Sequence, residues 1–302
     1  PKGKSLKDLV ESGVLHEGFS RLASTVYERP LHKHQEIAIR SLVEEEENIV
    51  VATGTGSGKT ECFLFPMLDA LLKSDVAGKP GVRAILVYPL NALANDQLYS
   101  RLVPAIADEL RDYGITVGRY TGQTSTRDGR ATIERELLDS PNSPMRERFG
   151  NSIPENWLLS REEMLATPPH VLVTNYAMLE HLLLLPRNAQ LFANADIKLM
   201  VLDEVHVYSG AQATEVALLL RKLKNRYAPG ADVRSIGTSA SLGDGEDETK
   251  KVIDFASRLF GAPFSKVVTS NRLDHHRLRN TKPLRTKGAK GWIAAHEALS
   301  SV

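Results

Sequence analysis

The chain has 302 residues, 42% hydrophobic and 25% charged, a composition that can bury a full core in one large domain with extensions or in one domain and part of a second. Its formal net charge of +1 confines any surface for a polyanion to a local patch, and its single cysteine, Cys62, excludes an internal disulfide and a cysteine-rich metal cluster. No apolar run reaches the roughly 20 residues that cross a bilayer and no signal peptide is visible, so we expect a cytoplasmic location and no membrane partner.

Short runs rich in β-branched residues recur along the chain and predict strands. Most are continuously apolar rather than alternating, which is typical of strands covered on both faces in a parallel sheet. Apolar residues at helical spacing lie between them. This alternation predicts an α/β fold with a doubly wound, mainly parallel sheet and helices on both of its faces. The expected strands are Asn48–Ala52, Ala84–Tyr88, Ile115–Tyr120, His170–Thr174, Lys198–Asp203 and Val233–Thr238, and the expected helices are Thr60–Lys73, Asn91–Leu110, Tyr176–Leu185, Ala211–Tyr227 and Val252–Phe260.

The alternation covers only part of the chain and divides the sequence into three predicted regions. These are an N-terminal helical extension at 1–45, the α/β domain at 46–265, and a segment at 266–302 that is rich in Lys and Arg. The last segment is interpreted as a basic linker, a nucleic-acid arm or the start of a truncated following domain. Within the domain, residues 121–167 are polar and interrupted by prolines, and we expect an insertion there with a helix at Ala131–Asp139.

A phosphate-binding loop is predicted where the strand ending at Ala52 meets the helix starting at Thr60. A glycine-rich turn in this context lets backbone N–H groups face phosphate oxygens, with the helix N-terminus behind them. Lys59 would reach the β- and γ-phosphates, and the Thr60 hydroxyl would bind Mg²⁺. Thr53 departs from the strict pattern, which has glycine there. An incidental glycine-rich turn is the alternative, and the flanking strand and helix disfavour it. The expected contacts of ATP are Thr53, Gly54, Thr55, Gly56, Ser57, Gly58, Lys59 and Thr60.

An acidic pair, Asp203 and Glu204, ends the apolar strand Lys198–Asp203. A phosphate-binding loop needs a carboxylate to hold the metal and a second group to position the attacking water. Asp203 would hold Mg²⁺ together with Thr60, and Glu204 would polarise the water. His206 could sense the γ-phosphate and couple to neighbouring motifs. Taken alone, the pair could also be a surface turn or the charged start of a helix, an alternative that the upstream loop disfavours.

With these elements the chain resembles the superfamily 2 helicases of the DEAD/DEAH type, here with Asp-Glu-Val-His at 203–206. The resemblance covers about residues 30–245 and implies a RecA-like P-loop NTPase domain that hydrolyses ATP with Mg²⁺. It implies that Gln35 reads the adenine base. It also implies a coupling motif, Thr238-Ser-Ala-Ser241, in which Ser239 and Ala240 link hydrolysis to strand movement. The nucleic-acid contacts that it implies are Pro89, Leu90, Asn91, Thr121, Gly122, Thr174 and Asn175.

Several of these residues also have simpler interpretations. Gln35 could be a solvated helix residue, and Thr174 could cap the helix that follows it. Tyr120 and Tyr176 could stack on bases or pack at the end of the sheet. His34 is expected to be a polar surface residue, because no metal-ligand spacing supports it.

Phrases around these motifs are similar to the bacterial YprA/MrfA-like DNA helicases and related defence-island helicases. This resemblance implies a role in DNA repair or antiviral defence. It also implies a nucleic-acid partner, single-stranded or duplex DNA in preference to RNA, with repair or defence proteins as further partners. A helicase motor closes its ATP site against a second RecA-like domain that supplies arginine fingers. No such motif lies in 266–302, so we expect a fragment that alone binds ATP weakly and hydrolyses it slowly or not at all.

Three functions are compatible with the sequence: an ATP-driven translocase or unwinding enzyme, an ATP-dependent clamp that holds nucleic acid without unwinding it, and a nucleotide-sensing subunit of a defence complex. The same motifs serve the first two. Stimulation of the ATPase by nucleic acid separates both from the third. Because the expected contacts are to backbone phosphates, binding should be independent of base sequence and sensitive to salt.

Overall fold

The computed structural model describes residues 2–54, 56–91, 94–95, 98–126, 129–139, 144–240 and 246–270. Thr55 of the expected phosphate loop, Ser241 of the expected coupling motif and the basic residues from 271 onward lie outside the described residues. Among the helices of the described part, none is both long and apolar enough to cross a membrane.

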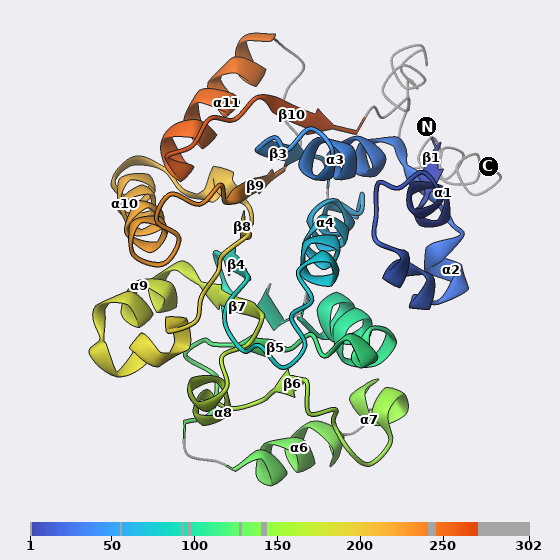
Figure 1. The fold of residues 1–302 in the computed structure, drawn as a ribbon. Helices are drawn as coiled ribbons and strands as arrows, with labels where there is room; N and C mark the ends of the chain where they lie inside the picture. The colour runs from blue at the N-terminus through green and yellow to red at the C-terminus, as the bar shows by residue number, and fades with distance from the viewer. Residues whose placement is uncertain are drawn as a thin grey trace, which may run out of the picture. The chain divides into compact units, whose positions relative to one another are not determined.

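An eight-stranded sheet forms the centre of the structure, with the strand order β10-β3-β9-β8-β4-β7-β5-β6 (Figure 1). Every pairing in this sheet is parallel. Parallel neighbours need crossover connections, which here carry the helices. The expected α/β fold with a doubly wound parallel sheet is therefore confirmed, and all six expected strands are present within two residues of their expected ends. The strands are β3 (Ile49–Ala52), β4 (Ala84–Tyr88), β5 (Val117–Arg119), β6 (Trp157–Leu158), β7 (Val171–Asn175), β8 (Leu199–Leu202), β9 (Arg234–Ser239) and β10 (Lys266–Thr269).

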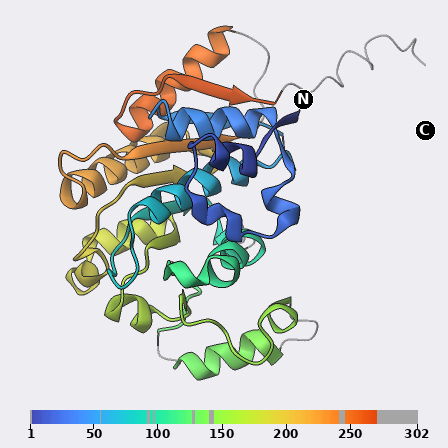
Figure 2. The same cartoon turned by 45° about the vertical axis from the view of Figure 1, so that its right-hand side comes forward.

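Helices cover both faces of the sheet, which explains why the strands are apolar without alternation. In β3, Ile49 and Val51 join one hydrophobic core, and Val50 joins the other. Figures 1 and 2 show α3 and α4 on one face and α9, α10 and α11 on the other. The first face is covered by α3 (Lys33–Val43), α4 (Lys59–Lys73), η2 (Leu98–Leu102) and η3 (Pro104–Glu109), and the second by α9 (Tyr176–Leu184), α10 (Gly210–Tyr227) and α11 (Glu246–Phe260).

The N-terminal region contains more than the expected helices. Strand β1 (Lys2–Ser5) pairs antiparallel with β2 (Pro30–His32), in a separate two-stranded sheet. These strands are short and carry mainly polar or proline residues, so no strand pattern predicts them. The segments between them are α1 (Leu6–Glu11), η1 (Glu17–Arg21) and α2 (Ser24–Tyr27).

Two edge strands correct the predicted domain limits. Strand β6 lies within residues 121–167 and pairs with β5, so this region supplies sheet as well as the expected helix. Strand β10 pairs with β3, so the sheet continues to Thr269, past the expected boundary at 265. Lys266 begins this strand, paired with Ile49, and its ammonium group lies 2.6 Å from a Glu45 carboxylate oxygen and 3.0 Å from one of Glu47. The helices of the 121–167 region are α6 (Arg130–Asp139), α7 (Pro144–Phe149) and α8 (Arg161–Ala166).

The helix expected at Asn91–Leu110 is less regular than its apolar spacing suggests. In the described residues 98–109, η2 and η3 have the wider turns of a π-helix. Pro104 begins η3, and its missing N–H group interrupts the regular hydrogen-bond ladder. A 3₁₀ turn, η4 (Arg111–Tyr113), then leads to β5.

Candidate nucleotide and nucleic-acid site

The predicted site residues meet at one edge of the sheet. All strands of this sheet run in the same direction, so the segments that follow them leave at the same edge, where α/β proteins bind their ligands. The strand order separates the residues into two neighbouring groups. The loops after β3, β9 and β8 carry the expected nucleotide residues, and the loops after β4, β7 and β5 carry the expected nucleic-acid residues.

The loop between β3 and α4 has the backbone shape of a phosphate cradle. Gly56 and Gly58 adopt the left-handed region, with φ of 73° and 79°. Thr53 is fully buried, and its hydroxyl oxygen accepts a hydrogen bond of 2.6 Å from the Ser57 hydroxyl. The departure from glycine at Thr53 therefore has a structural role, because this side chain ties the two ends of the loop together.

Lys59, the first residue of α4, faces the acidic pair. Its Nζ lies 2.9 Å from Glu204 Oε1 and 3.2 Å from the carbonyl oxygen of Ser239. Both charged side chains are largely shielded, with 13% and 21% of their side-chain surfaces exposed. A phosphate oxygen is a charged acceptor of the same kind as the Glu204 carboxylate, so the donor set around Lys59 fits a nucleotide phosphate. Glu204 itself has a left-handed backbone conformation, with φ of 50°, which is uncommon for a residue other than glycine.

Asp203 accepts a hydrogen bond from Thr238, a residue of the expected coupling motif for which no bond to Asp203 was predicted. The Thr238 hydroxyl donates to Asp203 Oδ1 and accepts from the backbone N–H of Glu204 at 3.1 Å. Burial raises the pKa of Asp203 above its usual range, while the bond from Thr238 opposes this shift. A half-buried carboxylate beside a threonine hydroxyl is the hard-oxygen environment that suits Mg²⁺, so Asp203, with Thr60 at the start of α4, could hold the metal.

His206 connects the acidic segment with the end of β9. Its Nδ1 lies 3.3 Å from the Ser239 hydroxyl and accepts from the backbone N–H of Ala240 at 3.3 Å. It is also 3.3 Å from Glu204 Oε2. An Nδ1 that accepts a hydrogen bond places the proton of a neutral ring on Nε2. The structure thus brings together the three residues for which sequence analysis predicted coupling.

Gln35 and His34 both reach the phosphate loop from α3. Gln35 is 2% exposed; its amide oxygen accepts from the backbone N–H of His32 at 2.8 Å and its amide nitrogen donates to Gly58 O at 3.1 Å. His34 is buried, and its Nε2 lies 2.9 Å from Ser57 O. The interpretations of Gln35 as a solvated residue and of His34 as a surface residue are therefore wrong. Burial lowers the pKa of His34, which favours the neutral ring that donates to Ser57.

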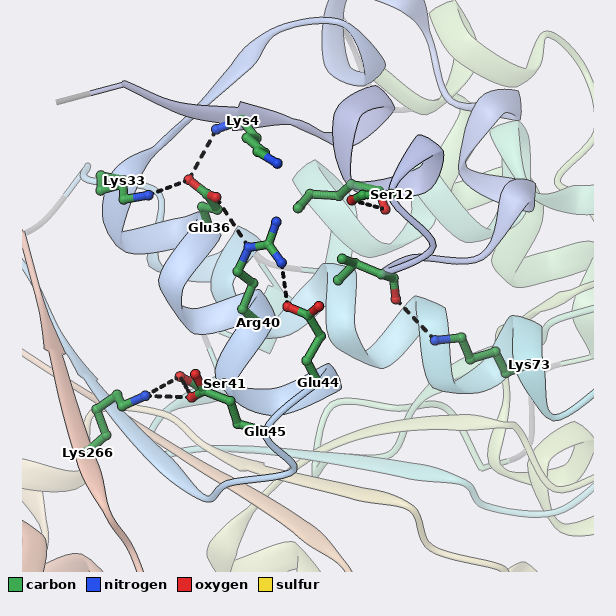
Figure 3. Close-up of polar contacts among 12 residues, drawn as sticks. Lys4, Ser12, Lys33, Glu36, Arg40, Ser41, Glu44, Glu45, Lys73 and Lys266 are labelled. Atoms are coloured by element: carbon green, nitrogen blue, oxygen red, sulfur yellow. Dashed lines mark hydrogen bonds and ion pairs between the residues drawn. The ribbon is translucent and has the colours of Figure 1, made fainter.

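A buried glutamate next to Gln35 holds α3 in place (Figure 3). Glu36 is 4% exposed and accepts from Lys33 Nζ at 2.8 Å, the Lys4 backbone N–H at 3.2 Å and Arg40 Nε at 3.3 Å. At the other end of the helix, Lys266 of β10 donates to Ser41 Oγ at 2.9 Å. These contacts join α3 to β1 and β10, and so position the side chains that touch the phosphate loop.

The second group of residues is connected by a pair of asparagines. Asn175 Nδ2 donates to Asn91 Oδ1 at 2.6 Å, which links the end of β7 to the segment after β4. Asn175 Oδ1 accepts from the Met178 backbone N–H at 2.8 Å and so caps α9. Thr174 is fully buried and donates to Tyr120 O at 2.7 Å, so the helix cap is Asn175 and not Thr174.

The turn after β5 presents backbone to the solvent. Thr121 is fully buried, and its carbonyl oxygen accepts from Arg161 at 2.7 Å. The Arg161 guanidinium also lies 5.1 Å from the centre of the Tyr120 ring, which is 3% exposed, so Tyr120 packs against protein. Gly122 is exposed, and a Cβ atom there would meet nothing within 4 Å. Leu90, after β4, is 63% exposed. Gly122 and Leu90 are therefore accessible to a ligand, whereas Thr121 and Thr174 are buried in the protein beside them.

Known proteins share this sequence pattern. The DEAD/DEAH box helicase family matches residues 32–141 and 148–249. The Druantia protein DruE of Escherichia coli strain UMEA 4076-1 is 33% identical across 86% of this chain, which corresponds to 19% of its own length. The uncharacterized ATP-dependent helicase YprA of Bacillus subtilis strain 168 is 29% identical across 87% of this chain and 29% of its own length.

Solved structures share the fold. The DUF1998 helicase MrfA bound to DNA is 25% identical, with a TM-score of 0.57 over 85% of this chain and 30% of MrfA. The DEAD-box helicase Mss116 bound to ssRNA and UDP-BeF has a TM-score of 0.60 over 90% of this chain and 47% of that chain at 18% identity, which supports the fold alone. The predicted similarity to the YprA/MrfA group is confirmed. The chain belongs to the DEAD/DEAH box helicase family, and its described part is a RecA-like ATPase domain of that family.

Proposed function

We propose that this chain is the first motor domain of an ATP·Mg²⁺-dependent translocase that acts on DNA in preference to RNA. The observation that carries the proposal is the arrangement of two residue groups side by side at one sheet edge. Lys59, Asp203 and Glu204 form the first, and the Asn91–Asn175 pair marks the second. The similarity to MrfA, whose solved structure contains DNA, supports DNA as the substrate.

The first group suggests how the chain would handle nucleotide. Lys59 and the N–H groups of the phosphate loop would hold the β- and γ-phosphates, Thr60 and Asp203 would hold Mg²⁺, and Gln35 would recognise the adenine. Mg²⁺ would neutralise charge on the phosphates during hydrolysis. A bound phosphate would compete with the Glu204 carboxylate for the Lys59 ammonium group. When Lys59 turns to phosphate, the Glu204 carboxylate is released to orient the attacking water.

The second group suggests how nucleic acid would be held. Pro89, Leu90 and Asn91 after β4, Asn175 at the end of β7 and the Gly122 turn after β5 lie at the ends of neighbouring strands. Backbone groups and neutral amides in such loops suit phosphate oxygens rather than base edges. Binding would then depend little on base sequence.

The complete motor extends beyond these residues. The chain spans 19% of the length of DruE and 29% of that of YprA. We propose that a second RecA-like domain closes over the nucleotide edge and supplies the arginine fingers, which can raise the rate by about 10³–10⁵. The 302-residue chain alone should therefore bind nucleotide weakly and hydrolyse it slowly or undetectably.

The decisive experiment measures ATP hydrolysis by the natural protein that carries this chain, with single-stranded DNA, duplex DNA, RNA and no nucleic acid. We expect stimulation by DNA and a smaller effect of RNA. Lys59→Ala should remove nucleotide binding. Stimulation by RNA alone would contradict the DNA preference, and an ATPase indifferent to every nucleic acid would favour nucleotide sensing over translocation.

A further inference from the structure

A tyrosine beside the acidic segment has a polar group for which the described protein provides no partner. Tyr208 is 1% exposed, and its hydroxyl oxygen is buried without a hydrogen-bond partner among the described residues. A buried hydroxyl that forms no hydrogen bond costs about 1–3 kcal/mol, whereas phenylalanine would fill the same space at no such cost. The hydroxyl is therefore expected to gain a partner in another state of the site.

Tyr208 belongs to the same turn as His206 and the acidic pair. Its backbone N–H donates to Val205 O at 3.2 Å and closes the 3₁₀ turn η6 (Val205–Val207). Only the short turn Val205–Val207 separates Tyr208 from the acidic pair in the chain, so Tyr208 lies one turn away from Glu204. Burial raises the pKa of Tyr208, and the negative charge of Asp203 raises it further. Mg²⁺ in proteins usually keeps several water ligands, so a metal at Asp203 would bring polar hydrogen-bond partners close to this hydroxyl.

The Tyr208 ring also contacts the start of α9, next to the nucleic-acid group. Its ring centre lies 5.8 Å from that of Tyr176, with an angle of 86° between the planes, the edge-to-face geometry that aromatic pairs prefer. Tyr176 is the first residue of α9 and follows Asn175, which is bonded to Asn91. Figure 1 shows β4 between β8 and β7, so the segment after β8 reaches past the end of β4 to make this contact.

We propose that Tyr208 is a positioning residue that couples the two groups: its ring follows the start of α9, and its hydroxyl binds to the hydrated metal site formed around Asp203. The proposal rests on the function proposed above and adds one specific link to it. Nucleic acid that shifts the Asn91–Asn175 loops would move Tyr176, and with it the Tyr208 hydroxyl. Nucleotide and nucleic acid would then strengthen the binding of each other, because such coupling is reciprocal.

The test uses binding alone, in the natural protein that carries this chain. The dissociation constant of a fluorescent single-stranded DNA is measured by anisotropy without and with a non-hydrolysable ATP analogue and Mg²⁺, and the ratio of the two is the coupling factor. Tyr208→Phe keeps the ring and removes the hydroxyl, whereas Tyr176→Leu keeps the Tyr208 hydroxyl and removes the ring contact. We expect each variant to lower the coupling factor toward 1, by about fivefold or more for a coupling of ordinary size.

Two further variants and a melting curve separate coupling from stability. The double variant should be no worse than either single variant, because both interrupt the same link. Tyr176→Phe, the matched control, keeps both rings and should leave the coupling factor unchanged. Tyr208→Phe should melt at the wild-type temperature or above it, because the hydroxyl contributes no internal hydrogen bond.

Each outcome decides between the two proposals. A Tyr208→Phe protein with wild-type coupling, or one that melts several degrees lower, would overturn the role of Tyr208 and leave the proposed motor function intact. A wild-type protein with a coupling factor of 1 would count against the motor function itself, and the link would fall with it.

Discussion

Lys59 and Glu204 are each other's nearest charged partner at the nucleotide edge, with 2.9 Å between Nζ and Oε1. One residue begins the helix after β3, and the other follows β8, two strands away in the sheet. The pair joins the side chain expected to hold phosphate, Lys59, to the side chain expected to position water, Glu204. Loss of the Lys59 charge and loss of the Glu204 charge should therefore affect different steps of the ATPase cycle.

Removing the Glu204 charge should separate binding from hydrolysis. In Glu204→Gln, Lys59 loses its carboxylate partner and remains free for phosphate, so nucleotide affinity should be equal to or tighter than that of wild type. Hydrolysis should fall by about 10²–10⁴-fold, the usual loss when a general base is removed. Fluorescent-nucleotide binding and steady-state ATPase of the natural protein check both. Glu215→Gln, an exposed glutamate of α10, is the matched control and should change neither. Full turnover by Glu204→Gln would show that another group positions the water.

Removing the Thr238 hydroxyl should weaken the metal site. This hydroxyl donates to Asp203 and accepts from the Glu204 backbone, so Thr238→Val leaves both groups without that partner. We expect a loss of about 1–3 kcal/mol in the free energy of unfolding and a weaker dependence of nucleotide binding on Mg²⁺. Chemical denaturation and Mg²⁺ titration measure the two effects. Thr238→Ser restores the hydroxyl and should recover most of both; if it does not, packing of the methyl group is the larger effect.

Gly58→Ala should destabilise the phosphate loop through a clash as well as through backbone strain. A Cβ at this position would lie 2.2 Å from Gln35 Nε2, and the backbone φ is +79°. Gly78→Ala is a control with a similar φ of +67° and open space around the new atom, so it should show only the backbone cost of about 1–2 kcal/mol. Urea unfolding of both variants should show a larger loss for Gly58→Ala. Equal losses would mean that Gln35 moves aside freely.

His34 should make stability depend on pH in weakly acidic solution. Its folded pKa is lowered by burial below the ordinary value of 6.5. The unfolded state then takes up a proton first, so the stabilisation is fully present above pH 6.5 and is lost as the pH falls toward the folded pKa. Urea unfolding between pH 5 and 8 should show this slope for the wild type and a smaller one for His34→Gln. His181→Gln, at an exposed position on α9, should retain the wild-type slope; a loss of slope there would assign the effect elsewhere.

Asn91→Ala should weaken nucleic-acid binding without changing its salt dependence. The substitution removes one neutral hydrogen-bond partner but leaves the Asn175 cap of α9 intact. A neutral hydrogen bond contributes about 1 kcal/mol, which corresponds to about a fivefold loss of affinity. The slope of log Kd against log salt should be unchanged, because no charge is removed. Asn151→Ala, an exposed asparagine distant in sequence from these loops, should bind like wild type. A changed slope for Asn91→Ala would indicate that charged groups have moved.

The sheet could be predicted almost completely, because its central strands are buried on both faces and therefore carry uninterrupted apolar runs. The edge strands could not. Strand β6 has two residues, and β10 begins with Lys266, whose charge is balanced by Glu45 and Glu47 from a distant part of the sequence. Strands β1 and β2 have no apolar run at all. Their pairing depends on tertiary contacts such as the bond between the Lys4 backbone and Glu36.

The candidate site was predictable where a motif carries its own chemistry and less so where a residue acts through a neighbour. Lys59, Asp203 and Glu204 lie together as their motifs indicate. The sequence predicts a surface position for His34, because a histidine next to Gln35 has no spacing that reveals its bond to Ser57. Tyr208 resembles any buried aromatic residue in sequence, and only the structure shows that its hydroxyl has no partner among the described residues. Thr238 was identified as part of a motif, but its bond to Asp203 depends on the adjacency of β8 and β9.

The direct pairing of β8 with β4 has a mechanical consequence. This ladder, from Ala84 opposite Leu199 to Val87 opposite Leu202, joins the nucleotide half of the sheet to the other half without interruption. A slip of one residue would exchange the side chains between the two hydrophobic cores and disturb the packing of both, so sliding of one half of the sheet past the other is disfavoured. The domain should therefore move as a rigid body when a ligand binds. Conformational change within it should be confined to the loops at the edge of the sheet.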